Sequence, residues 1–372
     1  MVRCSRSGRW VFAVTAFGAA AAGALVIGAG PLNPPAGAVG PTLKTLAEVE
    51  PRTALSATNT PGDVSNVYII TQPGSYYLTG HVVPTGGRNA IMVNADHVTI
   101  DLSGFALDGS QDATGFRAGI TNSGNRRNLV VRNGTIRNFR GYGMIGTFNT
   151  SSFEDLAFID SQGGQLEILQ SSGCTVRNVR TRATSGETGI QVGTNCVIDH
   201  CTVEGGGVGI TIGSGVVRGC SVLNPGSTGI FLGSGEVINC SVEGANSTSS
   251  LANAGISIGG SGHVEGCVLR SCASAGVYIS SRAEVIGCQF VSCAKGIGGN
   301  GTARIEGCQF TLCTTAAISM TGVHGIITGN RFSGNTANIS VPATMAVGEV
   351  LDFSAGGTLT GATTHPAANI VY

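Results

Sequence analysis

The chain is poor in charge and in aromatic side chains. Of its 372 residues, 11% are Asp, Glu, Lys or Arg and 5% are Phe, Trp or Tyr. Lysine occurs only as Lys44 and Lys295, so positive charge comes almost entirely from arginine, the residue that best matches planar carboxylate or sulfate groups. The one tryptophan, Trp10, lies in a leader that we expect to be removed. Tyr and Phe would therefore have to supply any platform on which a sugar ring stacks.

The first 38 residues predict a secretory signal peptide. A start with three arginines precedes an apolar run over residues 11–30 and a small-residue cleavage site at residues 36–38. An uncleaved anchor helix is the alternative, although the Ala- and Gly-rich run is a poor membrane span. Cleavage would leave 18 basic and 21 acidic side chains, a balance that argues against nucleic-acid binding. We expect a secreted protein, extracellular, periplasmic or on the cell surface, with no membrane contact after leader removal.

One short phrase returns at nearly even intervals between residues 196 and 313. It reads VIDHCTV, VVRGCSV, EVINCSV, HVEGCVL, EVIGCQF and RIEGCQF, and its cysteines are 19, 20, 27, 21 and 20 residues apart. The longest step contains a Ser/Asn insertion at residues 245–254. A period near twenty is typical of a solenoid, in which each unit is too small to bury its own apolar face and stacks on its neighbours.

Alignment on these cysteines places apolar residues in register. Two residues after the aligned cysteine position, every repeat has an apolar residue except for Thr181. In a further segment (TGIQV, VGITI, TGIFL, AGISI, AGVYI), apolar residues recur at every second position. Period two predicts β-strands, and the Gly, Asn and Ser between them predict sharp turns. We therefore expect an all-β chain of roughly ten or eleven coils. Its first inward column, three residues before the cysteine position, is Val131, Phe153, Val176, Ile198, Val217, Val237, Val264, Val285, Ile305 and Ile327.

These repeats resemble the right-handed parallel β-helix of the pectin-lyase-like superfamily over about residues 90–340. The segments IITGNRF and EVIGCQF are similar to its generic repeat. The resemblance implies a single-stranded right-handed parallel β-helix in a superfamily of lyases, glycosidases, epimerases and proteins that only bind. A leucine-rich repeat has a similar period, but it needs leucine where this chain has Val, Ile and Phe. We assign residues 39–66 to a linker or cap, 67–340 to the β-helix and 341–372 to a C-terminal cap.

Eleven cysteines follow the leader, an odd number that leaves at least one unpaired within a single chain. Six occupy the repeat position, three more follow five residues later, and both positions become Asn in the last coil, at Asn330 and Asn335. The pattern favours a ladder of buried thiols. Disulfides between neighbouring coils are an alternative, whereas a metal site is disfavoured because the cysteines are spread along the stack.

Outward positions beside the first inward column carry charges of alternating sign from residue 132 to residue 218. A surface ion-pair ladder, in which each pair stabilises little, is one interpretation. The functional alternative is a groove on a sheet face, where an acid, a base and guanidinium groups hold and process a uronate chain. The candidate residues are Arg177, Arg180, Arg182, Asp199, His200 and Arg218.

A second candidate region lies between residues 113 and 153, which contain six arginines and no acid. Arg137 and Arg140, with Tyr142 interleaved, are the residues we assign to binding of an anionic polymer. The alternative is a solvated surface of loops and strand edges.

No catalytic residue can be transferred from the resemblance. The chain lacks adjacent Asp residues, the Gly-His-Gly motif of the superfamily's hydrolases, and nonapeptide calcium repeats, so we expect no metal or cofactor and find no support for calcium. We expect a secreted protein that binds an acidic polysaccharide or cell-surface glycan, or cleaves it as a polysaccharide lyase or glycoside hydrolase. The alternative is a structural or adhesive protein of the cell surface. A phage spike would need trimer-forming segments that are not evident.

Overall fold

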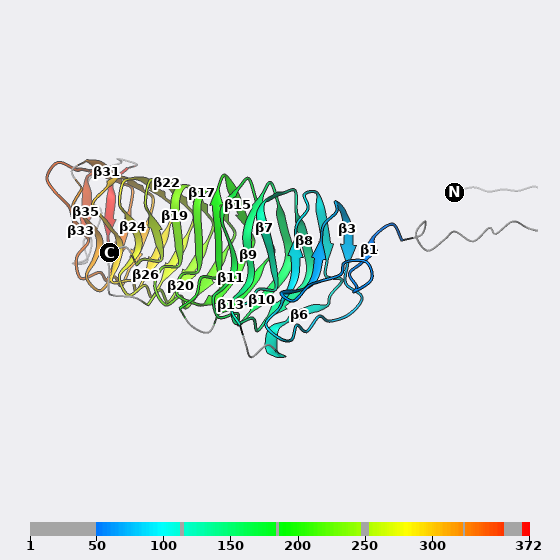
Figure 1. Ribbon diagram of the computed structural model, residues 1–372. Coiled ribbons are helices and arrows are strands. Elements are labelled where there is room, and N and C mark those ends of the chain that lie inside the picture. Colours follow the sequence, from blue (N-terminus) through cyan, green and yellow to red (C-terminus); the bar gives the residue numbers. More distant parts are fainter. Residues whose placement is uncertain (1–49, 112–114, 184–185, 247–252, 323, 353–366) are drawn as a thin grey trace, which may run out of the picture. The chain divides into compact units, whose positions relative to one another are not determined.

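The computed structural model describes residues 50–111, 115–183, 186–246, 253–322, 324–352 and 367–372. The predicted leader and residues 39–49 of the predicted linker lie outside the described residues. Residues 51–372 form one unit of stacked turns, and Figure 1 shows strands of successive turns side by side from β3 to β35. Within the described part of the chain, no helix is long and apolar enough to cross a membrane. The one helical element described is a 3-10 turn, η1 (Gly109–Gln111).

The turns build three faces of parallel strands, and each strand pairs with its counterparts on the turns before and after it. Face 1 contains β2 (Asn66–Ile70), β4 (Asn89–Val93), β7 (Ile120–Arg127), β9 (Tyr142–Asn149), β11 (Gly164–Ser172), β14 (Ile190–Thr194), β17 (Ile210–Arg218), β19 (Ile230–Ile238), β21 (Ile256–Ile258), β24 (Ala275–Ile279), β27 (Lys295–Gly299), β30 (Ala316–Met320) and β33 (Ile339–Ser340).

Face 2 follows face 1 along the chain, and the long strands β17 and β19 extend into it. Its other members are β1 (Thr53–Ala54), β3 (Gly74–Tyr77), β5 (Val98–Asp101), β8 (Val130–Arg137), β10 (Ser152–Ile159), β12 (Thr175–Arg177), β15 (Cys196–Asp199), β22 (Ser261–Glu265), β25 (Arg282–Ile286), β28 (Thr302–Glu306), β31 (Gly325–Thr328) and β34 (Ala346–Val347).

Face 3 completes each turn and includes the ends of β8 and β10. It also contains β6 (Ala106–Asp108), β13 (Arg180–Ala183), β16 (Thr202–Gly205), β18 (Ser221–Leu223), β20 (Ser241–Glu243), β23 (Val268–Arg270), β26 (Gln289–Val291), β29 (Gln309–Thr311), β32 (Arg331–Ser333), β35 (Val350–Asp352) and β36 (Asn369–Val371).

The predicted fold class is confirmed: the protein is an all-β parallel solenoid of about 13 turns. The predicted ten or eleven coils are too few, because the turns at both ends lie outside the ten aligned residues of the first inward column. Tyr76 and Ile100 extend the first inward column upstream, and Val347, which is 39% exposed, continues its register downstream. All ten residues predicted for that column have no exposed surface, and each is in register with its neighbour on the next turn. Thr181, the polar exception in the second column, is fully buried and its hydroxyl has no hydrogen-bond partner.

The corner between faces 2 and 3 requires left-handed backbone. The residue before the repeat cysteine has a positive φ, 51° at His200, 52° at Asn239 and 60° at Gly219. Asn and Gly adopt this conformation at low cost, which explains why they recur before the cysteine. The two faces on either side of the corner point in different directions, and this separates residues that are close in sequence.

The cysteines form a ladder of buried thiols, as predicted. The structure describes eleven free, buried cysteines. Along the ladder, the backbone N–H of Cys201 donates to the Sγ of Cys220 on the next turn, with a distance of 3.4 Å. In the last coil Asn330 replaces the thiol and accepts from the Cys308 N–H at 2.9 Å. Burial raises the pKa of the Cys313 thiol to about 12, so that this thiol stays protonated near neutral pH.

Candidate functional site

The alternating charges predicted after the first inward column form a ladder across face 2. The register pairs Glu154 with Arg177, Arg177 with Asp199, and Asp199 with Arg218. The Nη2 atom of Arg177 lies 3.0 Å from Glu154 Oε2, and Arg218 Nε lies 2.9 Å from Asp199 Oδ1. The hydrogen bond from Arg218 lowers the pKa of Asp199, which keeps this carboxylate ionised. Both arginines thus already have carboxylate partners, and their binding to a glycan stays a prediction.

The other predicted residues of this group do not share that face. His200 occupies the corner, where its Nδ1 lies 2.7 Å from Asp199 Oδ1. Arg180 and Arg182 lie on face 3, beyond the corner, and Arg182 Nη2 is 2.6 Å from Asp160 Oδ2. The six residues are therefore split between two faces and the corner between them, because a sharp turn falls in the middle of the predicted group.

The three residues predicted upstream, Arg137, Arg140 and Tyr142, do not all lie together either. Arg137 lies on face 3, with its Nε 2.9 Å from Asp108 Oδ2. Arg140, in contrast, lines a hollow of about 350 Å³ together with Gly115, Phe116 and Gln162. We call this site the Phe116 hollow. Tyr142 lies beside it, since the rings of Phe116 and Tyr142 meet edge to face with their centroids 5.3 Å apart. The structure thus brings Arg140 and Tyr142 to one place and leaves Arg137 outside it.

Three consecutive turns form the Phe116 hollow at the corner that leads into β7, β9 and β11. The N–H of Gly141 donates to the Arg117 carbonyl at 3.0 Å, and the N–H of Gly163 donates to the Gly141 carbonyl at 2.7 Å. A Cβ at Gly163 would lie 2.7 Å from Phe116 Cζ, so glycine is needed for the ring to pack there. The ring nevertheless remains 64% exposed, which leaves it available to a ligand.

A partly buried carboxyl group adds to this site. Tyr142 is in register with Gly164, and a Cβ at Gly164 would lie 2.5 Å from Glu167 Oε1, so the Glu167 side chain covers that glycine. Burial raises the pKa of Glu167. Burial and, second, the charge of Glu167 raise the pKa of Tyr142. The raised pKa of Glu167 brings its carboxyl group closer to neutral pH, which suits proton transfer, whereas the raised pKa of Tyr142 takes its phenol further from neutral pH.

Sequence reasoning missed Phe116, Gln162 and Glu167. Phe116 and Gln162 lie in the connections before β7 and β11, outside the repeated phrase, and Glu167 occupies an ordinary outward position of a strand. What they share is a position within four residues of the start of a face 1 strand. Among the described residues, no group of three or more His, Cys, Asp or Glu side chains is arranged to hold a metal ion.

Replacement of Glu167 by Gln should reveal the cost of the buried charge. Because the folded-state pKa is raised, the favourable contribution of the neutral carboxyl group is complete below the unfolded pKa, about 4.3, and is lost as the pH rises through the folded-state value. Glu167→Gln should therefore stabilise the protein more at pH 7 than at pH 4, as measured by urea unfolding. The matched control is Glu243→Gln at an exposed site. A Glu167→Gln effect that does not change with pH would contradict the expected charge cost.

The fold and this site define the protein as a parallel β-solenoid with an aromatic and arginine-lined hollow beside one face. No family model and no curated protein matches the sequence. Similar solved structures include the A-module of mannuronan C-5 epimerase AlgE6 from Azotobacter vinelandii, with a TM-score of 0.42, 15% identity and coverage of 73% of this chain and 80% of that one. The A-module of AlgE4 from the same organism has a TM-score of 0.34 and 12% identity over 85% of this chain and 88% of that one.

A third similar structure is the tailspike protein of E. coli bacteriophage HK620, solved in complex with a pentasaccharide. It has a TM-score of 0.42 and 11% identity, and the match covers 82% of this chain and 67% of the tailspike. At these values the likeness carries no argument about function. The function has to be argued from the residues of this chain.

Proposed function

We propose that the protein binds an acidic polysaccharide at the Phe116 hollow. The observation that carries the proposal is an exposed aromatic ring beside an arginine, an amide and a phenol. The face of Phe116 can stack on the apolar side of a sugar ring. Arg140 supplies the planar donor group that suits a uronate carboxylate, and Gln162 can donate to and accept from hydroxyl groups.

The position of the hollow suits a polymer. It lies across three turns, and strands on neighbouring turns are about 4.8 Å apart, so that its extent along the stack is on the order of 10 Å. A chain of sugars can therefore enter and leave along the outside of the stack. The predicted leader supports an extracellular location, which is part of the proposal, because acidic polysaccharides of that kind are found outside the cell.

Processing of the bound polymer is a second candidate function, favoured by Glu167 and Tyr142. A lyase removes the proton next to the uronate carboxylate, which requires a base and a positive charge near the carboxylate. Tyr142 and Glu167 are residue types that can exchange a proton, and Arg140 can stabilise the carboxylate. An assay for unsaturated or reducing ends on uronic-acid polymers decides whether binding is followed by cleavage.

Phe116→Ala and Arg140→Ala should each weaken retention on a uronic-acid polymer by about tenfold, equivalent to about 1.4 kcal/mol. The reason is the loss of stacking in the first variant and of the carboxylate partner in the second. Affinity electrophoresis on gels containing alginate or polygalacturonate measures the effect.

The matched control is Phe231→Ala, which removes another exposed aromatic ring, on β19. Its retention should equal that of the unmodified protein. Retention on none of the acidic polymers would contradict the proposal and favour the structural or adhesive alternative. Equal retention of Phe116→Ala would show that the polymer binds elsewhere.

A further inference from the structure

Face 2 carries a groove that is separate from the Phe116 hollow. Two hollows of about 330 and 400 Å³ share Arg282, Ala283 and Glu284 among their lining residues, and together they form one continuous depression, which we call the face 2 groove. It crosses β19, β22, β25, β28 and β31. The residues along its middle are all Gly or Ala and are in register on consecutive turns: Gly235, Gly262, Ala283, Ala303 and Gly325.

The register makes the groove run along the stack, across the strands. Four steps of about 4.8 Å between neighbouring strands give a length of about 19 Å. The middle residues occupy an inward position, and Ala283 and Ala303 belong to the core at 2% and 1% exposure, so only backbone lies between the two rows of outward side chains. An extended chain can therefore lie against the backbone of the sheet.

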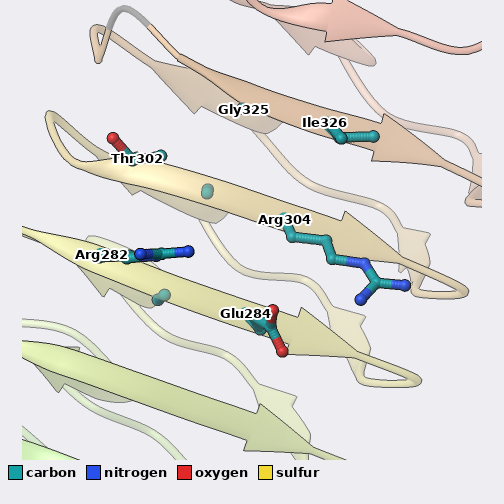
Figure 2. A pocket seen from close by; sticks show the side chains of 8 residues that line it. Arg282, Glu284, Thr302, Arg304, Gly325 and Ile326 are labelled. Atoms are coloured by element: carbon teal, nitrogen blue, oxygen red, sulfur yellow. The ribbon is translucent and has the colours of Figure 1, made fainter.

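Side chains of different character flank the groove on its two sides. Figure 2 shows Arg282 and Thr302 near the start of their strands, and Glu284 and Arg304 further along the same strands. Ser261 continues the first row. The second row consists of Glu236, His263, Glu284, Arg304 and Ile326.

The charges of the groove are mixed and only partly paired. His263 Nδ1 lies 3.5 Å from Glu284 Oε2, and its Nε2 lies 3.3 Å from Glu265 Oε2. Arg304 Nη2 lies 2.5 Å from Glu306 Oε2. Within the described residues, Arg282 forms no ion pair. The groove thus presents hydrogen-bond acceptors, on Glu236 and Glu284, next to donors on Arg282.

We propose that the face 2 groove binds a linear chain of uncharged sugars. Neighbouring hydroxyl groups both donate and accept, so they can pair with carboxylates and with a guanidinium group at the same time. An acidic chain would meet the carboxylates of Glu236 and Glu284 at close range. A sugar chain also advances by roughly one strand spacing per residue, so that successive sugars meet successive turns. Ile326, 51% exposed at one end, offers an apolar contact for the C–H face of a ring.

A peptide fits the groove less well. Strands in the middle of face 2 already pair with the turns on both sides, so that their backbone groups are not free to extend a sheet with a bound peptide. The described groove also lacks a row of apolar pockets, because Ile326 is the one large apolar side chain that lines it.

The test uses the full chain and a panel of neutral polysaccharides, namely β-glucans, xylan, mannan and galactan, in pull-down and affinity gels. At least one should retain the protein, with a change of less than about twofold between low and high salt, because screening acts on charged ligands. Arg282→Ala and Glu284→Gln should each weaken that retention about tenfold. The control Arg270→Ala removes an exposed arginine on face 3 and should have no effect.

The outcomes separate this proposal from the proposed function. Phe116→Ala should leave retention on the neutral polymer unchanged, and Arg282→Ala should leave retention on a uronic-acid polymer unchanged. Failure of every neutral polymer to retain the protein would overturn the proposal, as would retention that Arg282→Ala and Glu284→Gln do not alter. Circular dichroism of each variant confirms that the sheet is intact. The proposal would also be overturned if peptides from a library bind this groove and no sugar does.

Discussion

Replacement of Phe310 by alanine should lower the free energy of unfolding by about 3–5 kcal/mol. The ring is 1% exposed and belongs to the second inward column. It stacks on Phe290 with a centroid distance of 4.8 Å and on Phe332 with 5.2 Å, and the planes are within 4° and 10° of parallel. Alanine would leave a cavity between two rigid rings that the neighbouring turns cannot fill.

Urea unfolding measures this loss, with Phe231→Ala as a control that removes a ring exposed by 39%. The control should change the free energy of unfolding much less, because an exposed ring leaves no cavity. In a solenoid each turn contacts mainly its neighbours, so that the Phe310→Ala effect should be concentrated near β26, β29 and β32 in hydrogen exchange. If Phe310→Ala and Phe231→Ala lower the free energy of unfolding equally, the stacked rings do not stabilise the protein as expected.

The second large effect is expected at Asn330, which is fully buried. Its Oδ1 accepts from the Cys308 N–H at 2.9 Å, and its Nδ2 donates to the Ile305 carbonyl and to Asn369 Oδ1, both at 3.1 Å. Asn330→Ala removes all three partners and leaves buried polar groups unpaired, which should cost about 2–4 kcal/mol.

Asn330→Cys should cost clearly less than Asn330→Ala. A thiol occupies the same position on earlier turns and makes the same type of contact: Cys220 Sγ accepts from the Cys201 N–H, and the Cys308 thiol donates to the Val285 carbonyl at 3.5 Å. Urea unfolding under reducing conditions compares the two variants. If Cys and Ala are equally destabilising, the buried thiols pack as apolar groups and their hydrogen bonds contribute nothing measurable.

The sequence predicted the interior of the protein better than its exterior. Inward positions obey two strict periods, two within a strand and about twenty between turns, so that Val264 or Phe310 can be placed without knowledge of the loops. Strands β1 to β6 lie mostly within the segment assigned to the β-helix and have the same inward column, with Tyr76 and Ile100, but the ten aligned residues of that column begin only at Val131. The coil number was low for that reason.

The site was predicted only in part, because it depends on contacts between connections. Arg140 and Tyr142 were selected for their chemistry, and the structure places them together. Phe116 reaches them through the corner before β7, and no period governs that corner. His200 illustrates the opposite case: it stands where other repeats have Gly or Asn, and the positive φ typical of that position puts it on the corner rather than on a face.

The equivalence of successive turns also has a consequence for how such a protein can vary. Cys288 and Cys308 are 20 residues apart and occupy the same position on adjoining turns. Loss of residues 288–307 would therefore connect equivalent positions of two turns and keep every later turn in register. Duplication of the same segment would lengthen the molecule. Molecular length is thus adjustable in increments of about 4.8 Å, one gene segment at a time, independently of what the surface recognises.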